Sequence, residues 1–152
     1  MILFPYCYRE RITHETMLEY IIKNEIDFFH DKSILGEGVE FIGLINKEGR
    51  MESSMCKNEI NLTEDRKEMF MMQFRLQSSM HKDYDDEFGP VSHTITEREN
   101  SIFVSIPIIA YTVLAIMKKT IDITVAINKI KVAIRNFENH NKELIVQKSG
   151  QT

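Results

Sequence analysis

The stretch Thr63–Phe88 reads TEDRKEMFMMQFRLQSSMHKDYDDEF and carries the strongest helix pattern in the 152-residue chain. Thr63 can cap the amino end of a helix, and acidic residues follow it in the first turn, where the helix dipole favours negative charge. Gly89 and Pro90 come directly after Phe88, and neither residue readily continues an α-helix. The stretch therefore predicts one helix from Thr63 to about Phe88.

Apolar side chains form two stripes on this predicted helix, whereas a helix that only covers a sheet needs one. The first stripe is made of Met69, Met72, Leu76 and Met80. The second contains Phe70, Phe74 and Phe88, and its spacing from Phe70 also includes Gln77 and His81. Two stripes indicate two packing partners. We assign the first stripe to the chain's own sheet and the second to a partner surface, and Met71 falls outside the core-facing stripe.

A β-hairpin is predicted before this helix. Val39–Lys47 (VEFIGLINK) and Met51–Lys57 (MESSMCK) are typical of two strands. The turn between them contains Gly49, which can supply a positive φ. Because the returning strand is short and polar, we expect it at the edge of a sheet.

Three further strands are predicted after the helix, at Val91–Glu99, Ile102–Pro107 and Tyr111–Lys119. The uncharged stretch Ser101–Met117 approaches the length of a membrane span, but Pro107 interrupts it and polar side chains dilute it. Its Ile, Val and Phe residues favour two buried strands joined by a tight turn. We therefore expect no membrane span here.

Helices are predicted at both ends of this pattern. The first extends from Thr13 to about Asp31, and the last follows a cap at Thr120 or Asp122. The order is helix-β-β-helix-β-β-β-helix, and its short connections favour a five-stranded antiparallel sheet. We predict an α/β fold with the middle helix on one face of the sheet and the terminal helices on the other. Residues 13–139 would form a single domain, after an uncertain leader at 1–12 and before a polar tail at 140–152.

The charge and the cysteines limit the partners and the compartment. The chain has 19 basic and 23 acidic residues and a net charge of −4. Nucleic-acid binders usually carry a basic excess, so we expect no nucleic acid as a partner. The two cysteines make no disulfide framework, and the apolar start of the chain does not resemble a signal peptide, so we expect a cytoplasmic protein.

Motifs for catalysis, nucleotides or metals are not recognisable. Gly36-Glu37-Gly38 has neither the third glycine nor the strand–helix context of a dinucleotide site, and no P-loop pattern occurs. His81 and His93 flank the end of the middle helix but would need further ligands to bind a metal. We therefore predict no catalytic residue, no metal site, no cofactor and no enzymatic activity.

The element order resembles the roadblock/dynein-light-chain fold, which is related to profilin-like and longin domains. The middle of the chain also resembles an uncharacterised family from ammonia-oxidising archaea, over about Phe41 to Phe137. The segments that carry this second resemblance are Phe41–Asn46 with Gly49-Arg50, Gln73–Gln77, Phe88–Val91 and Thr96–Glu99.

The roadblock resemblance implies a function. Roadblock domains form homodimers or heterodimers by pairing their middle helices and the adjacent strand, and they act as scaffolds or regulators, often beside small GTPases. For this chain the resemblance implies a homodimer and a regulatory partner such as a small GTPase. We predict that the dimer interface consists of the second stripe and the adjacent strand, at Phe70, Phe74, Gln77, His81, Phe88, Thr94 and Thr96.

Two functions therefore stay open. The first is a non-enzymatic dimeric interaction or regulatory scaffold module. The alternative is a small-ligand sensor domain of PAS-like or profilin-like type, which needs an apolar pocket with a few polar groups between sheet and helix. A flat, exposed apolar helix and strand favour the first function, and a cavity favours the second.

Overall fold

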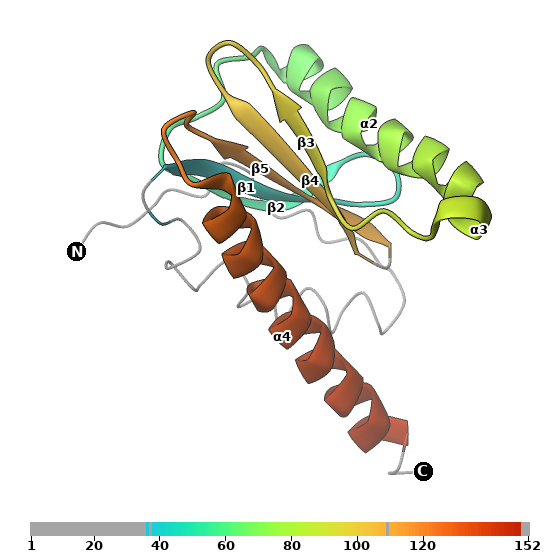
Figure 1. The fold of residues 1–152 in the computed structure, drawn as a ribbon. Helices are drawn as coiled ribbons and strands as arrows, with labels where there is room; N and C mark the ends of the chain where they lie inside the picture. The colour runs from blue at the N-terminus through green and yellow to red at the C-terminus, as the bar shows by residue number, and fades with distance from the viewer. Residues whose placement is uncertain (1–35, 37, 109, 150–152) are drawn as a thin grey trace. The chain divides into compact units, whose positions relative to one another are not determined.

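The computed structural model describes Gly36 and residues 38–108 and 110–149 (Figure 1). The predicted leader and the predicted helix from Thr13 to about Asp31 lie outside these residues. Residues 38–121 belong to one compact unit and the last helix to a second. In chain order the elements are β1 (Val39–Ile45), β2 (Met51–Cys56), α2 (Glu64–His81), η3 (Lys82–Tyr84), α3 (Asp85–Phe88), β3 (Thr94–Glu97), β4 (Ile102–Ile108), β5 (Tyr111–Met117) and α4 (Ile123–Ser149).

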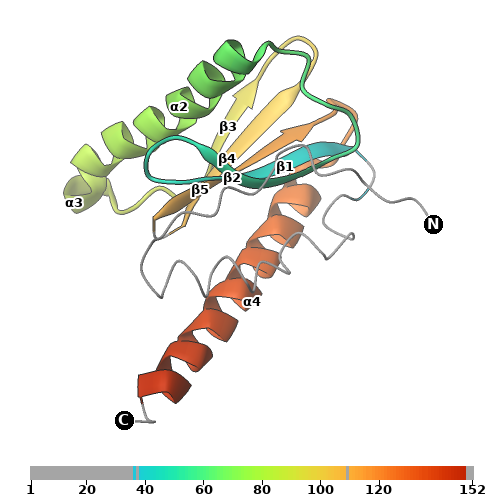
Figure 2. The same ribbon diagram turned by 180° about the vertical axis from the view of Figure 1, so that it is seen from behind.

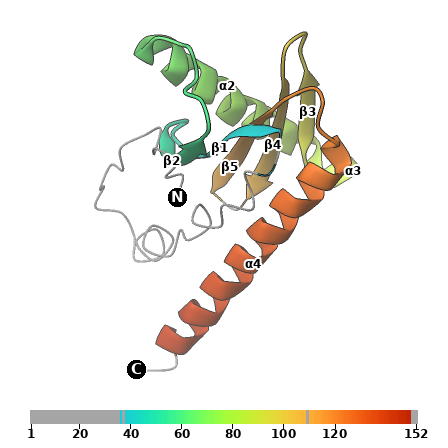
Figure 3. The same ribbon diagram turned by 90° about the vertical axis from the view of Figure 1, so that its left-hand side faces the viewer.

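The strands form one five-stranded sheet in the order β2-β1-β5-β4-β3. Every pair of neighbours is antiparallel, which confirms the predicted sheet. Among the described residues β2 lies at one edge, as its short polar sequence predicted, and β3 lies at the other. Figure 2 shows the β1–β2 hairpin from behind, and Figure 3 shows α2 along one face of the sheet.

The turn of the β1–β2 hairpin is fixed by hydrogen bonds. The Asn46 side-chain oxygen accepts from the backbone N–H groups of Glu48 and Arg50, both at 3.0 Å. Gly49 has a φ of 80°, the positive value expected for this turn. Arg75 of α2 donates from Nε to the Lys47 carbonyl at 2.8 Å, so the turn is tied to the helix.

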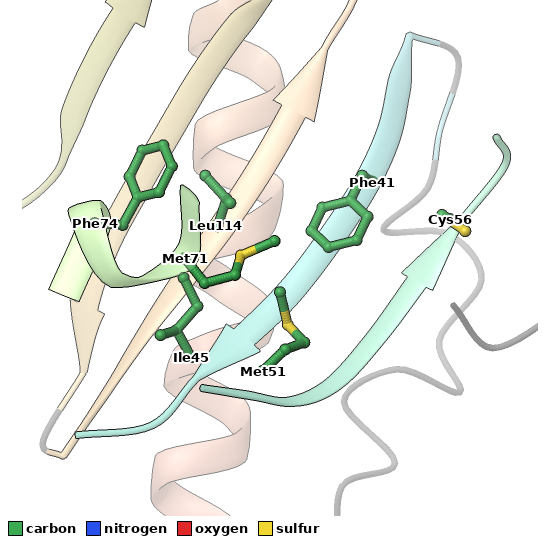
Figure 4. Close-up of a cluster of buried hydrophobic side chains, with 7 residues drawn as sticks. All are labelled: Phe41, Ile45, Met51, Cys56, Met71, Phe74 and Leu114. Atoms are coloured by element: carbon green, nitrogen blue, oxygen red, sulfur yellow. The ribbon is translucent and has the colours of Figure 1, made fainter. Parts of the chain in front are cut away.

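A hydrophobic cluster fills the space between α2 and the sheet (Figure 4). Its buried members are Phe41, Ile45, Met51, Cys56, Met71, Phe74 and Leu114. Phe70 packs edge-on against Phe74, with 5.0 Å between ring centroids, and against Phe103 at 5.5 Å. Beside this cluster the hydroxyls of Ser78 and Thr112 lie 3.2 Å apart, so the contact between helix and sheet includes one hydrogen bond.

The two faces of the middle helix are the reverse of those predicted. Phe74 and Met71 are the buried residues of α2, so the assignment of Phe74 to a partner surface is wrong, and so is the exclusion of Met71 from the core. Met69, Met72, Leu76 and Met80, which we expected to pack on the sheet, are exposed. Both stripes follow the helical repeat, and periodicity alone does not say which of two apolar faces meets the sheet.

The middle helix is also divided, whereas one helix was predicted. Thr63 caps α2 as expected, since its hydroxyl accepts from the Arg66 N–H at 3.4 Å. After His81 the chain tightens into the 3-10 turn η3 and then forms the single turn α3. Gly89 ends it with a φ of 80°, and its N–H donates to the Asp85 carbonyl at 2.8 Å.

The last helix, α4, forms part of the second unit and begins at a cap. Asp122 accepts from the Val125 N–H at 3.2 Å, which decides between the two caps that the sequence left open. Buried positions recur every three or four residues on this helix, at Ala126, Ile127, Ile130 and Ile134. The helix continues to Ser149, through most of the range that we expected to be a polar tail. None of the described helices is long and apolar enough to cross a membrane.

Candidate interaction surface

An apolar ridge lies on the side of α2 that faces away from the sheet. Met69, Leu76 and Met80 are 67%, 55% and 66% exposed, and Met72 is exposed as well. The spacing i, i+3, i+7, i+11 places these four side chains in one continuous row along the helix. We call Met69, Met72, Leu76 and Met80 the α2 ridge.

Two aromatic side chains continue the exposed apolar surface beyond α2. Tyr84 at the end of η3 is exposed, and Phe88 at the end of α3 is 85% exposed. A Phe ring left in water loses the burial that normally makes it favourable in a protein. Exposed aromatic and methionine side chains therefore lie at this end of the helix, among the acidic residues of η3 and α3.

The edge strand β3 lies near the end of α2. Within the described part of the chain it pairs with β4 alone. Its side chains Thr94 and Thr96 are half-buried on the α2 side of the sheet, and Ile95 is exposed on the opposite side. Thr94 and His81 line the same small cavity of about 50 Å³, so the β3 edge and the end of α2 are neighbours. Edge strands offer backbone groups with which another strand can pair.

Charged groups lie on the same compact unit as this apolar surface. Lys67 and Glu64 form an ion pair at 3.4 Å in the first turns of α2, and Lys119 and Glu97 form one at 3.2 Å at the end of β3. Arg98 stacks over the Phe103 ring at 5.4 Å from its centroid.

The predicted interface residues divide into two groups. Phe74 is buried in the core, and Phe70 packs against the core and is partly buried. Gln77, His81, Thr94 and Thr96 are half-exposed, and Phe88 is exposed. The four ridge residues were recognised in the sequence as one stripe, but that stripe was assigned to the core. Size was the signal that could have corrected this assignment, because Phe has the larger apolar area to bury and so the stronger tendency to take the core position.

The surface holds no cluster of metal-ligating side chains among the described residues. In the portion of the chain that the structure describes, no three His, Cys, Asp or Glu side chains lie close enough together to hold a metal ion. The acidic residues of η3 and α3 lie mostly at the exposed end of the helix.

Solved structures of roadblock proteins superimpose on this chain. A Roadblock/LC7 domain from Streptomyces avermitilis has a TM-score of 0.57 at 10% identity and covers 72% of this chain and 92% of its own. The gliding protein MglB from Thermus thermophilus has a TM-score of 0.59 at 6% identity, with coverages of 88% and 99%. A structure described as MglB with a tetrameric arrangement has a TM-score of 0.54 at 7% identity, with coverages of 86% and 91%.

No protein-family model and no curated protein matches the chain. At the identities of the solved structures the likeness concerns the fold alone, and the resemblance to an archaeal family stays a prediction. The element order, the strand order and these superpositions agree with one another. The chain has the roadblock/LC7 fold.

Proposed function

We propose that the chain is a non-enzymatic interaction module that self-associates through the α2 ridge and the β3 edge. The observation that carries the proposal is the α2 ridge, four exposed apolar side chains in one row on a helix whose other face already packs on the sheet. Single exposed apolar residues are normal, but a contiguous exposed row is typical of an interaction surface.

A two-fold pairing of two copies would cover the ridge. In such a pairing the same surface meets itself, so the ridge of one copy packs against the ridge of its partner. Helices packed in this way lie about 8–10 Å apart, close enough to remove Met69, Leu76 and Met80 from water. Methionine suits this role because its side chain is flexible and adapts to a partner.

The β3 edge supports the same arrangement. It neighbours the end of α2, and Thr94 and Thr96 keep the β3 surface polar enough to be stable in water before association. Strand pairing across two copies would satisfy backbone groups at this edge. A solved structure with the same fold is described as MglB with a tetrameric arrangement, which supports self-association of a chain with this fold.

The proposal also includes the compartment, the role and the partner of the module. We place the module in the cytoplasm, in a regulatory or scaffolding role. A small GTPase is the class of partner that the roadblock resemblance implies. Such a partner would bind a dimer, so self-association is the step to test first.

The test compares two substitutions that each place a carboxylate on an exposed apolar position. Leu76→Asp lies in the ridge, and Val132→Asp lies at an exposed position on α4. Gel filtration coupled to light scattering should show that Leu76→Asp reduces the molecular mass to that of one chain, because an unpaired carboxylate is costly to bury. Val132→Asp should keep the mass of the unmodified protein, and circular dichroism should be the same for all three. Equal masses for the two variants would contradict the proposal.

A further inference from the structure

A cavity of about 240 Å³ lies between the β1–β2 hairpin, the β2–α2 connection and the first half of α2. All of its lining residues belong to the unit that holds the sheet. The apolar part of its wall is formed by Phe41, Met51, Ile60, Met71 and Met72. For comparison, a dry cavity of about 150 Å³ in another protein holds one benzene molecule.

Ser54 of β2 places a hydroxyl at this cavity. Its residue is 1% exposed, and its Oγ has no hydrogen-bond partner among the described residues. Ser54 pairs with Gly43 and, like Phe41 and Cys56, faces α2. Buried hydroxyls are normally hydrogen-bonded, so an unsatisfied one beside a cavity indicates a missing partner.

Met51 covers the neighbouring part of the cavity wall. A Cβ atom placed on Gly43 would lie 2.5 Å from the Met51 sulfur, so the Met51 side chain lies directly over Gly43, the pairing partner of Ser54. Figure 4 shows Met51 and Phe41 side by side on the α2 side of the hairpin. A methionine side chain rotates easily and is readily displaced.

The charged residues around the cavity carry both signs. Arg50, Glu59 and Glu68 are exposed at its rim, and Lys67 is paired with Glu64 at 3.4 Å. Acidic and basic groups are therefore interspersed, and the rim offers no cluster of one sign. A rim of mixed sign offers no patch that is complementary to an anion or to a cation.

We propose that this cavity binds a small, uncharged, mainly apolar molecule with one hydroxyl or carbonyl group. The apolar body lies among Phe41, Ile60 and Met71, and the polar group meets the Ser54 hydroxyl after Met51 moves aside. The proposal does not depend on self-association. Met72 alone is shared with the α2 ridge.

Methionine methyl groups provide reporters for the test. Met51 and Met71 line the cavity, whereas Met55 and Met117 are buried elsewhere in the same unit. The full chain, labelled with ¹³C at the methionine methyl groups, is titrated with phenol and separately with toluene. Saturable shifts are expected at Met51 and Met71, with Met55 and Met117 unchanged.

Two serine variants then test the polar contact. Ser54→Ala should weaken phenol binding by about two- to tenfold, the range that one neutral hydrogen bond accounts for, and leave toluene binding unchanged. The matched control Ser53→Ala, at a buried neighbour on the same strand, should change neither affinity.

Three outcomes would overturn the proposal. The first is the absence of saturable shifts at Met51 and Met71 with either compound at millimolar concentration. The second is equal shifts at Met55 and Met117, which would mean unspecific binding. The third is unchanged phenol affinity in Ser54→Ala. None of these outcomes bears on the α2 ridge, which is tested by the molecular mass of the protein in solution.

Discussion

Phe74 and Leu76 stand two residues apart on α2 and lie on opposite faces of it. Phe74 is 8% exposed in the cluster against the sheet, whereas Leu76 lies on the α2 ridge. Phe74→Ala should therefore lower the free energy of unfolding by about 3–5 kcal/mol, because it removes buried area and leaves a cavity. Leu76→Ala should change it by less than about 0.5 kcal/mol, as at other surface positions. Urea unfolding of dilute, separate chains measures both.

If Leu76→Ala lowered the free energy of unfolding more than Phe74→Ala, the result would support the orientation of α2 that we first predicted. Helical periodicity alone could not choose between the orientations. Both stripes have helical spacing, so by that criterion each could meet the sheet. The orientation of α2 depends on how its side chains fit particular residues of the sheet. Phe70 and Phe74 stack edge-on with Phe103, and Ser78 bonds to Thr112, and both contacts join residues that lie far apart in the sequence.

Gly49 adopts a positive φ in the β1–β2 turn, a conformation that other residues rarely adopt. Its φ is 80°, and a Cβ atom there would lie 2.6 Å from the Met72 sulfur. Gly49→Ala should therefore lower the free energy of unfolding by at least about 1–2 kcal/mol, the cost of a left-handed backbone for a residue with a Cβ atom. The exposed neighbour Glu48→Ala is the control and should have little effect in the same urea titration. Equal stabilities for the two variants would mean that the turn does not need glycine.

At the scale of elements, α2 depends on its cap. The Thr63 hydroxyl accepts from the Arg66 N–H, which otherwise has no partner within the helix. Thr63→Ala should lower the free energy of unfolding by about 0.5–2 kcal/mol, and Thr63→Asn, which can also cap, should restore most of it. Thermal unfolding followed by circular dichroism compares the three proteins. A Thr63→Asn variant as unstable as Thr63→Ala would show that the cap is not what stabilises this end.

Local signals predicted most of the elements. The alternation of apolar residues, the turn glycine and the caps at Thr63 and Asp122 depend on neighbouring residues, so they can be found in the sequence. The residue at which β3 begins depends on its pairing with a second strand. We predicted this strand from Val91, but it begins at Thr94, whose pairing partner is Ser105 of β4. Pro107 follows two residues later and has no N–H to donate to a longer ladder.

At the scale of the whole molecule, the fold was predictable and the surface was not. The order of helices and strands, with their short connections, was sufficient for the antiparallel sheet. The cavity beside Ser54 and the α2 ridge arise from segments that meet only in three dimensions. In the proposed dimer a second copy of the chain covers the ridge. The folding of a single copy does not predict such a contact.

The mass of the unmodified full chain in solution decides whether two copies associate. Sedimentation equilibrium from the low micromolar to the submillimolar range should give about 36 kDa, twice the 17.9 kDa of one chain, and a lower average mass on dilution. The dilution effect is expected because exposed surfaces associate reversibly. A mass of 17.9 kDa that persists at the highest concentration would contradict self-association through the α2 ridge.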